Sequence, residues 1–500
     1  MDMLANMAAG FAVALSWNTL LYCLIGVTLG TFIGVLPGIG SLAAVSMLLP
    51  VVFYLEPTTA LVMLAGVFYG AEYGGSTASI LLNLPGTASA AVTCLDGHPL
   101  ARQGRAGVAL FVTTIASFFG AAVGILVLTF AAPLLVHLAR NFTSAEFFAV
   151  ILLGLVSAAT ISSGSALRGL TMVLFGLLLG TVAIDINSGA QRFTFGIPAL
   201  YDGFSIVVVA MGLFGVSEVM LSIRRPGGIA QQGRIGLRSM IPSRADMHTF
   251  PAPATRGALI GSFIGALPGA GQTIAAFLSY GVEKRVSRRP ERFGKGAIEG
   301  IAAPESANNA ASITAFLPTL TLGIPGSATM ALILGALMVY GITPGPMLIE
   351  RNPELFWGLI ASFWIGNIML TVLNIPLINL WVRLLRIPYA YLYPTILVLV
   401  CIGVFSVNLN VLDVVLVVGF GLLGYALRLA GFEPAPLLLG FILGPLLEEN
   451  LRRTLLVSRG DFLAMLERPL SGTILAITAL LLVWALAAPL WRALRARGAP

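Results

Sequence analysis

The stretch that decides the fold is Gly30-Thr-Phe-Ile-Gly-Val-Leu-Pro-Gly-Ile-Gly40, because it occurs a second time as Gly261-Ser-Phe-Ile-Gly-Ala-Leu-Pro-Gly-Ala-Gly271. Eight of the eleven positions are identical, and the two copies are 231 residues apart. Each copy places Pro-Gly-x-Gly inside an apolar run, where proline lacks a backbone donor and glycine adopts conformations that end a helix. The sequence therefore predicts two helices that are interrupted within an apolar environment.

The composition around these motifs is that of a membrane protein. Hydrophobic residues make up 58% of the chain, charged residues make up 10%, and the mean hydropathy is +0.95. Soluble domains contain about 25% charged residues. A full membrane span needs about 20 apolar residues, and the apolar runs here predict an all-α polytopic membrane protein with roughly 10–12 spans or half-spans.

The formal net charge of +7 reflects topology rather than a nucleic-acid partner. Twelve of the 28 basic residues lie between Arg224 and Lys295, where they flank apolar segments as the positive-inside rule predicts for cytoplasmic loops. The cysteines and histidines are dispersed without the spacing of a metal site, and no nucleotide-binding or hydrolase motif occurs. We therefore expect no cofactor, no nucleic-acid binding and no enzymatic activity.

The repetition extends beyond the first motif. Ala71 to Ser79 matches Pro304 to Ser312, which aligns Glu72 with Glu305, and Leu84 to Ser89 matches Ile324 to Thr329. This order predicts two homologous repeats. The expected boundaries are a first membrane repeat at 1–222, a cytoplasmic linker at 223–256, a second membrane repeat at 257–447, and an amphipathic segment with a terminal helix at 448–500.

Charge also indicates how the repeats are oriented. Basic residues lie on both sides of the apolar segment 257–280, so a re-entrant hairpin that turns at Pro268–Gly271 fits better than a single span. The flanks of the first motif contain no Lys or Arg, which favours inverted repeats. The C-terminal region is ambiguous, because arginines both precede and follow the final apolar run.

The four interrupted helices supply the candidate substrate site. A helix that begins after a break presents free N–H groups and a positive dipole end, which suit a carboxylate. Hydroxyl and amide side chains next to the breaks add donors, although a simple kink, or hydroxyls bonded to their own helix, would explain the same residues. The predicted substrate-binding residues are Pro37, Gly38, Gly40, Ser41, Gly86, Thr87, Ser89, Pro268, Gly269, Gly271, Gln272, Thr273, Gly326, Ser327 and Thr329.

A candidate cation site lies in the same segments. Ionisable residues at membrane depth are functional by default, although a glutamate can also cap a helix or pair with an arginine near the interface. Carboxylate, amide and hydroxyl oxygens without a positive charge suit a hard cation such as sodium, while protonation of a glutamate is the alternative. The predicted residues are Glu72, Ser76, Glu305, Asn308 and Asn309.

Several longer motifs resemble one family. The paired Pro-Gly-x-Gly motifs, Phe293-Gly-Lys-Gly-Ala-Ile-Glu299, Ala303-Pro-Glu-Ser-Ala-Asn-Asn309 and Gly444-Pro-Leu-Leu-Glu-Glu-Asn450 are similar to the large membrane subunit of tripartite tricarboxylate transporters, the TctA family. The resemblance covers nearly the whole chain.

The resemblance implies a multi-pass protein of the bacterial inner membrane that works with a small four-span membrane subunit and a periplasmic substrate-binding protein. It also implies uptake of a di- or tricarboxylate driven by an ion gradient. Sodium symport is the first expectation and proton symport the second. An anion channel is the alternative from another class, because re-entrant half-helices also build selectivity filters.

Overall fold

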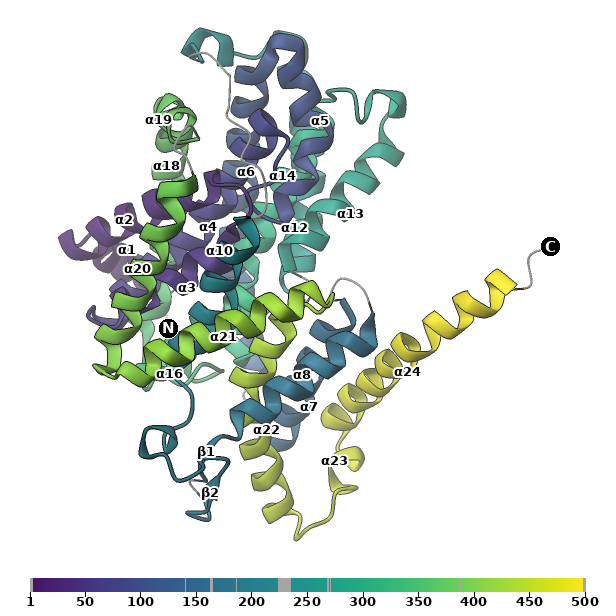
Figure 1. The fold of residues 1–500 in the computed structure, drawn as a ribbon. Coiled ribbons are helices and arrows are strands. Elements are labelled where there is room, and N and C mark those ends of the chain that lie inside the picture. The colour runs from purple at the N-terminus through teal and green to yellow at the C-terminus, as the bar shows by residue number, and fades with distance from the viewer. Residues whose placement is uncertain are drawn as a thin grey trace.

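The computed structural model describes residues 3–139, 141–161, 165–185, 187–223, 235–267, 269, 271–385 and 389–497. Figure 1 shows that these residues form a helical body from which one helix, α24, extends outward. The only strands in the described part form a short antiparallel hairpin, β1 with β2, which the sequence did not predict.

The elements up to the end of the hairpin are α1 (Met3–Ala14), α2 (Trp17–Val35), α3 (Gly40–Val52), α4 (Pro57–Leu82), η1 (Ser89–Ala91), α5 (Thr93–Leu100), η2 (Ala101–Arg105), α6 (Ala106–Ala139), α7 (Ser144–Ile161), α8 (Ala166–Gly180), β1 (Ala183–Ile184) and β2 (Gln191–Arg192).

The middle of the chain contains η3 (Pro198–Leu200), α9 (Ile206–Ala210), η4 (Met211–Val216), α10 (Ser217–Ser222), η5 (Leu237–Met240), α11 (Arg244–Thr249), α12 (Pro251–Gly265), α13 (Gly271–Val286), η6 (Pro290–Arg292), α14 (Glu299–Thr314), α15 (Phe316–Leu322) and α16 (Ala328–Val339).

The remaining elements are α17 (Leu348–Arg351), α18 (Pro353–Asn374), α19 (Ile378–Leu384), α20 (Tyr389–Asn408), α21 (Val411–Leu429), α22 (Ala435–Val457), α23 (Ala464–Glu467) and α24 (Pro469–Arg497).

Helix α2 packs against α4 through a row of glycines. Gly26, Gly30 and Gly34 face the backbone carbonyls of Met63, Val67 and Ala71, in that order. A Cβ atom on Gly34 would lie 2.2 Å from the Ala71 oxygen, so only glycine permits this approach. The Gly30-x-x-x-Gly34 spacing therefore serves close packing of two helices.

Helix α12 packs against α14 in the same way. Its glycines 257, 261 and 265 face the carbonyls of residues 303, 307 and 311. The glycines of α12 come 231 positions after those of α2, whereas the α14 residues that they contact come 240 positions after the corresponding residues of α4. At that separation Glu72 corresponds to Ser312, so the predicted alignment of Glu72 with Glu305 is wrong by two helical turns. The sequence match was misled because both segments are rich in small residues.

The ends of α4 and α15 agree with the separation of 240 residues. Helix α4 ends at Leu82, and Asn83 adopts the left-handed conformation with φ of 58°. Helix α15 ends at Leu322, and Gly323 adopts the same conformation with φ of 72°. The chain therefore leaves both helices with the same local geometry before the Pro-Gly motifs at 85–86 and 325–326.

Helices α12 and α13 form an antiparallel hairpin. Arg256, near the start of α12, donates from Nη2 to Oε1 of Glu283 at 2.7 Å and from Nε to Oε2 at 2.8 Å, near the end of α13. The chain therefore reverses direction between Gly265 and Gly271, and both free ends of the hairpin lie together. This is the geometry expected of a re-entrant element.

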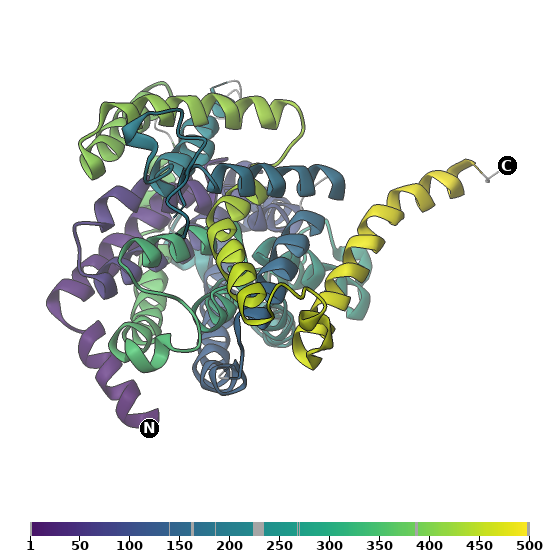
Figure 2. The same cartoon turned by 90° about the horizontal axis from the view of Figure 1, so that it is seen from below.

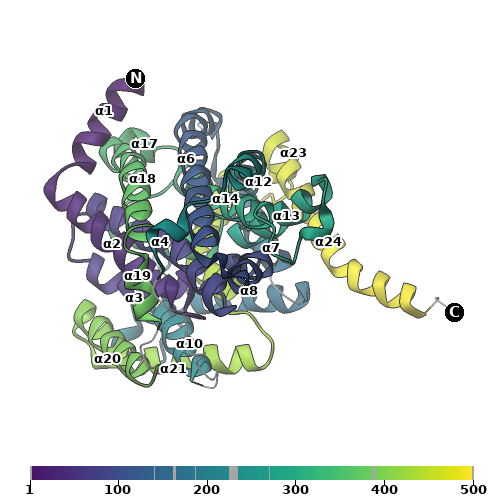
Figure 3. The same cartoon turned by 90° about the horizontal axis from the view of Figure 1, so that it is seen from above.

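Several helices are suited to a membrane by length and composition. Among the described residues, five helical segments of at least 18 residues are apolar enough to cross a bilayer, and seven shorter apolar helices of 10–17 residues accompany them. Figures 2 and 3 show that α24, which contains one of the five, leaves the body of the molecule after its first turns against α7. The chain is therefore a multi-span membrane protein.

Candidate functional site

The predicted helix breaks are present at the described Pro-Gly motifs. Helix α2 ends at Val35 and α3 begins at Gly40, while Gly38 and Gly40 have φ values of 89° and 73°. In the second copy, Gly269 and Gly271 have φ values of 78° and 64°. A left-handed backbone of this kind strains any residue with a Cβ, which explains the glycines. Pro268 lies outside the described residues.

The two breaks of the N-terminal region meet. The Gly38 N–H donates to the Pro85 carbonyl at 3.3 Å, and the Gly86 N–H donates to the Gly75 carbonyl at 3.3 Å. A Cβ atom on Gly86 would lie 1.9 Å from the Gly34 oxygen. The loop after α4 is therefore held between the end of α2 and the middle of α4.

The corresponding loop before α16 is arranged similarly but more loosely. A Cβ atom on Gly326 would lie 3.4 Å from both the Gly265 oxygen and the Ala315 Cβ. These are ordinary contact distances, so this loop leaves space that the loop at Gly86 does not. Ser327 begins α16 by accepting a hydrogen bond from the Met330 N–H at 3.3 Å, which is an N-cap.

The carboxylate of Glu72 is held by three of the predicted substrate residues. The Thr87 hydroxyl donates to Glu72 Oε2 at 3.3 Å, the Ser89 hydroxyl donates to the same oxygen, and Gln272 Nε2 donates to Oε1 at 3.2 Å. Glu72 is 0% exposed. Because Gln272 is in the first turn of α13, this cluster joins the second Pro-Gly-x-Gly break to the loop after α4.

The carboxylate of Glu305 is held by a second set of hydroxyls. Ser76 donates to Oε1 at 2.6 Å, Thr93 donates to the same oxygen, and Ser117 donates to Oε2 at 3.2 Å. Asn309 Nδ2 donates in turn to the Ser117 hydroxyl at 2.7 Å. These side chains come from α4, α5, α6 and α14, so Glu305 lies where four helices meet.

Some polar atoms of α14 and α13 have no hydrogen-bond partner among the described residues. They are both side-chain polar atoms of Asn308, Oδ1 of Asn309 and Oε1 of Gln272, and all of them are buried. Within the described ranges neither Glu72 nor Glu305 forms an ion pair, and no group of three or more His, Cys, Asp or Glu side chains converges as for a transition metal. The site therefore combines two carboxylates with unpartnered amide oxygens, a donor set that suits a hard monovalent cation.

Several of the remaining predicted residues lie in the first turns of three helices. Gly40 and Ser41 are in the first turn of α3, Gly271 and Thr273 are in the first turn of α13, and Thr329 is buried in the first turn of α16. Thr93 and Ser117 bind Glu305 but were not predicted. Ser117 lies in Ile115-Ala-Ser-Phe118, which recurs as Ile360-Ala-Ser-Phe363, and this repetition is the one sequence feature that could have indicated it. No repeated motif that we recognised contains Thr93.

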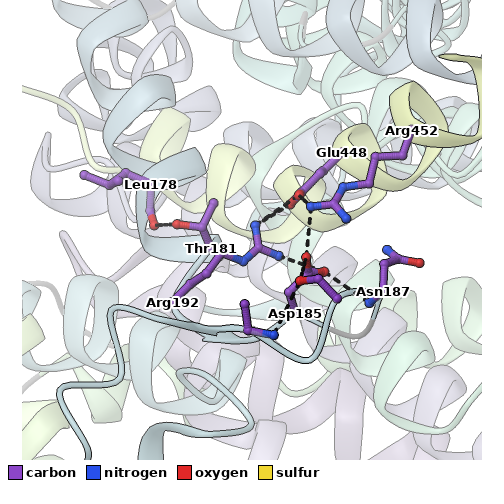
Figure 4. A network of polar contacts seen from close by, with 9 residues as sticks. Leu178, Thr181, Asp185, Asn187, Arg192, Glu448 and Arg452 are labelled. Atoms are coloured by element: carbon purple, nitrogen blue, oxygen red, sulfur yellow. Dashed lines mark hydrogen bonds and ion pairs between the residues drawn. The ribbon is translucent and has the colours of Figure 1, made fainter. Parts of the chain in front are cut away.

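A second polar cluster lies at the opposite end of the molecule from the basic loops. Figure 4 shows Arg192 and Arg452 between the carboxylates of Asp185 and Glu448. The Ser188 hydroxyl, the Asn187 N–H and the two arginines hold the pKa of Asp185 at about 2. This network lines a cavity of about 1040 Å³ and fixes the β1–β2 hairpin to α22.

Comparison with known proteins identifies the family of this chain. Residues 20–439 match the Tripartite tricarboxylate transporter TctA family. The chain therefore belongs to this family of membrane transport subunits, and it is not an enzyme.

Two relatives come from Agrobacterium vitis. An uncharacterized 52.8 kDa protein in the TAR-I ttuC′ 3′ region is 49% identical over 481 residues, which is 95% of each chain. An uncharacterized protein in the TAR-II ttuC′ 3′ region is 54% identical over 226 residues, which is 45% of this chain and 93% of the relative. No solved structure matches the chain.

Proposed function

We propose that this protein imports a di- or tricarboxylate across the bacterial inner membrane in symport with sodium. It acts as the large subunit beside a small four-span membrane subunit and a periplasmic substrate-binding protein, as the tripartite family implies. The observation that carries the proposal is the buried polar region at the helix breaks, where two carboxylates form no ion pair with any described Lys or Arg.

The substrate is assigned to the helix breaks. Helices α3 and α13 begin at Gly40 and Gly271, where unpaired N–H groups and the helix dipole favour an anion. The hydroxyls of Thr87 and Ser89 and the amide of Gln272 face the same region. These groups recognise a carboxylate without selecting one acid, so substrate choice is assigned to the binding protein.

The coupling cation is assigned to Glu72, Ser76, Glu305, Asn308 and Asn309. Two ionised carboxylates in a low-dielectric interior are costly unless a cation compensates them. The unpartnered oxygens of Asn308 and Asn309 add the neutral ligands that sodium prefers. Proton binding by a glutamate is the competing assignment.

The transport cycle is assigned to two inverted repeats that meet at this site. The glycine contacts of α2 with α4 and of α12 with α14 have the same pattern, and the hydrogen bond from Gln272 to Glu72 crosses from one unit to the other. Broken helices around a central site and paired structural units are typical of secondary transporters.

Reconstituted vesicles test this function. The full complex, with its small subunit and loaded binding protein, should accumulate radiolabelled citrate or succinate when sodium is higher outside, and collapse of the sodium gradient should abolish accumulation. Uptake that persists without a sodium gradient but needs a proton gradient would reassign the cation. Unitary conductance events would instead support the anion channel.

A further inference from the structure

The donors expected to bind the anionic substrate already bind an anion in this structure. Thr87, Ser89 and Gln272 were all assigned to the substrate, and all three donate to the carboxylate of Glu72. This carboxylate has the same chemistry as the cargo. A substrate carboxylate cannot use the hydroxyl protons of Thr87 and Ser89 while Glu72 accepts them, because each hydroxyl has one proton to donate. Gln272 Nε2 has two N–H donors, and Glu72 takes one of them.

The amide of Gln272 shows the same orientation toward an anion. Its Nε2 atom donates to Glu72 Oε1, while its Oε1 atom is buried and has no partner among the described residues. A buried amide oxygen without a partner costs free energy. Oxygen is the atom that a cation would bind, so the side chain offers a donor to a carboxylate and an acceptor to a cation at one place.

We propose that Glu72 is an internal competitor for the substrate's carboxylate, and that sodium neutralises Glu72 once the substrate displaces it. In the empty carrier the Glu72 carboxylate occupies the Thr87, Ser89 and Gln272 donors. When a substrate carboxylate takes these donors, two anions become neighbours in the protein interior. Sodium at Glu72 and at the unpartnered oxygen of Gln272 removes this repulsion. Substrate binding therefore becomes conditional on sodium.

The neighbouring cluster explains why a displaced Glu72 needs a cation. Ser76 is one turn after Glu72 on α4, and its hydroxyl is already committed to Glu305 at 2.6 Å. No arginine or lysine pairs with either glutamate within the described residues. The displaced carboxylate therefore has neither free hydroxyl donors nor a basic side chain on that side, and an external cation is the remaining compensation.

The competitor is present in only one of the two similar units. The position that corresponds to Glu72 is Ser312, whose hydroxyl donates to the Asn308 carbonyl at 2.9 Å within its own helix. Among the described residues, the loop at Ser327 therefore has no carboxylate at that position to hold. This asymmetry fits a single coupling residue rather than a shared structural requirement of the two loops.

The test compares Glu72→Gln with the wild type in the complete membrane complex, and it rests on the carboxylate transport proposed above. Binding of citrate and of succinate is measured at fixed pH and ionic strength while sodium replaces choline. We expect wild-type affinity to rise with sodium. Without sodium, Glu72→Gln should bind on the order of tenfold more tightly than the wild type, and sodium should no longer improve its affinity.

Two further variants separate this effect from a general change in the site. Glu305→Gln removes the other buried carboxylate without freeing Thr87, Ser89 or Gln272, so it should gain no sodium-free affinity. Ser89→Ala removes a donor and should weaken substrate binding at every sodium concentration.

The outcomes distinguish this proposal from the proposed function. Equal sodium-free affinities of the wild type and Glu72→Gln, or an equal sodium dependence in both, would overturn the role of Glu72 and leave the proposed function unaffected. Wild-type affinity that does not change with sodium would contradict sodium coupling. Failure of the wild type to bind either acid would reject the proposed function, and the role of Glu72 would fall with it.

Discussion

Individual hydroxyl groups stabilise the two buried carboxylates of the protein by hydrogen bonds. The carboxylate of Glu305, which is 1% exposed, accepts hydrogen bonds from Ser76, Thr93 and Ser117. Hydrogen bonds to charged groups contribute about 1.5–3 kcal/mol each, more than neutral ones. These hydroxyls replace the water that Glu305 loses on folding, and each of them is therefore expected to matter for stability.

Substitution of Ser76 by Ala tests this expectation. Ser76→Ala leaves Glu305 Oε1 with one donor instead of two, and should lower the free energy of unfolding by about 2 kcal/mol. Ser46→Ala is the matched control, because that buried hydroxyl donates only to the Ala43 carbonyl three residues earlier and should lose less than about 1 kcal/mol. Thermal unfolding of the purified complex in detergent measures both. Equal losses would contradict the role of the hydroxyls around Glu305.

At the level of elements, the two Pro-Gly loops that follow α4 and α15 differ in how tightly they are packed. The loop at Gly86 lies directly against the carbonyl of Gly34, whereas the loop at Gly326 has ordinary contact distances to Gly265 and Ala315. The two copies of the motif therefore differ in how well they tolerate a side chain in place of the glycine. The difference is tertiary, because neither glycine needs a left-handed backbone.

Alanine substitution at the two positions should separate them. Gly86→Ala places a methyl group 1.9 Å from the Gly34 oxygen and 2.6 Å from Gly75 Cα, so it should displace the loop, disturb the donors Thr87 and Ser89, and reduce uptake at least on the order of tenfold. Gly326→Ala meets its nearest atoms at 3.4 Å and should retain uptake within about threefold of the wild type. Vesicle uptake normalised to protein amount is the measurement, and an equal effect of both substitutions would refute the comparison.

The β1–β2 hairpin depends on charge. Because the pKa of Asp185 is lowered to about 2, its ionised form is the one that the hairpin holds. Its contribution is fully present above the ordinary pKa of about 3.9 and is lost as the pH falls through about 2.

Limited proteolysis tests this hairpin. We expect cleavage within 183–192 to be unchanged between about pH 8 and pH 5 in the wild type. Asp185→Asn should be cleaved faster at neutral pH, because it weakens the attachment to Arg192 and Arg452. Loosening of the wild-type hairpin between those two pH values would contradict this account.

Over the whole molecule, charge is distributed between two ends. Helix α5, the start of α6 and the end of α13 lie at one end in Figure 1, and the hairpin and the end of α22 lie at the other. The first end contains the arginine- and lysine-rich segments. At the other end, Arg452, Arg453 and Arg468 pair with Glu448, Glu449 and Glu146. Arg105, Arg256 and Arg292 at the first end are paired as well, so pairing does not distinguish the two ends. The first end has more basic residues, which favours it as the cytoplasmic one.

Cysteine labelling tests this orientation. In a background without Cys23, Cys94 and Cys401, Val457→Cys and Val286→Cys place one thiol at each end, at positions that are 86% and 56% exposed. A membrane-impermeant maleimide added to intact spheroplasts should label Val457→Cys at once, and Val286→Cys only after permeabilisation. The reverse pattern would invert the proposed orientation.

Some features of the fold were predictable because their causes are local. Proline and glycine act on their own backbone, so the interruptions at Pro37, Pro85 and Pro325 followed from the motifs themselves. The pairing of Glu72 with Glu305 failed because a run of small residues aligns almost equally well at two registers. The contacts of Gly257 and Gly261 with α14 fix the register by close packing, which no local pattern reports.

The sequence by itself determined the membrane class, the family resemblance, the broken helices and a set of candidate polar residues, since composition and backbone chemistry are properties of short segments. Only the tertiary structure decided which of those residues meet. Gln272 binds Glu72 although the two are 200 positions apart, and Thr93 and Ser117 join Glu305 from helices that share no motif with it. Side chains this distant meet only where the glycine-lined helices pack closely, and that packing gives a carboxylate of the protein the donors expected for its cargo.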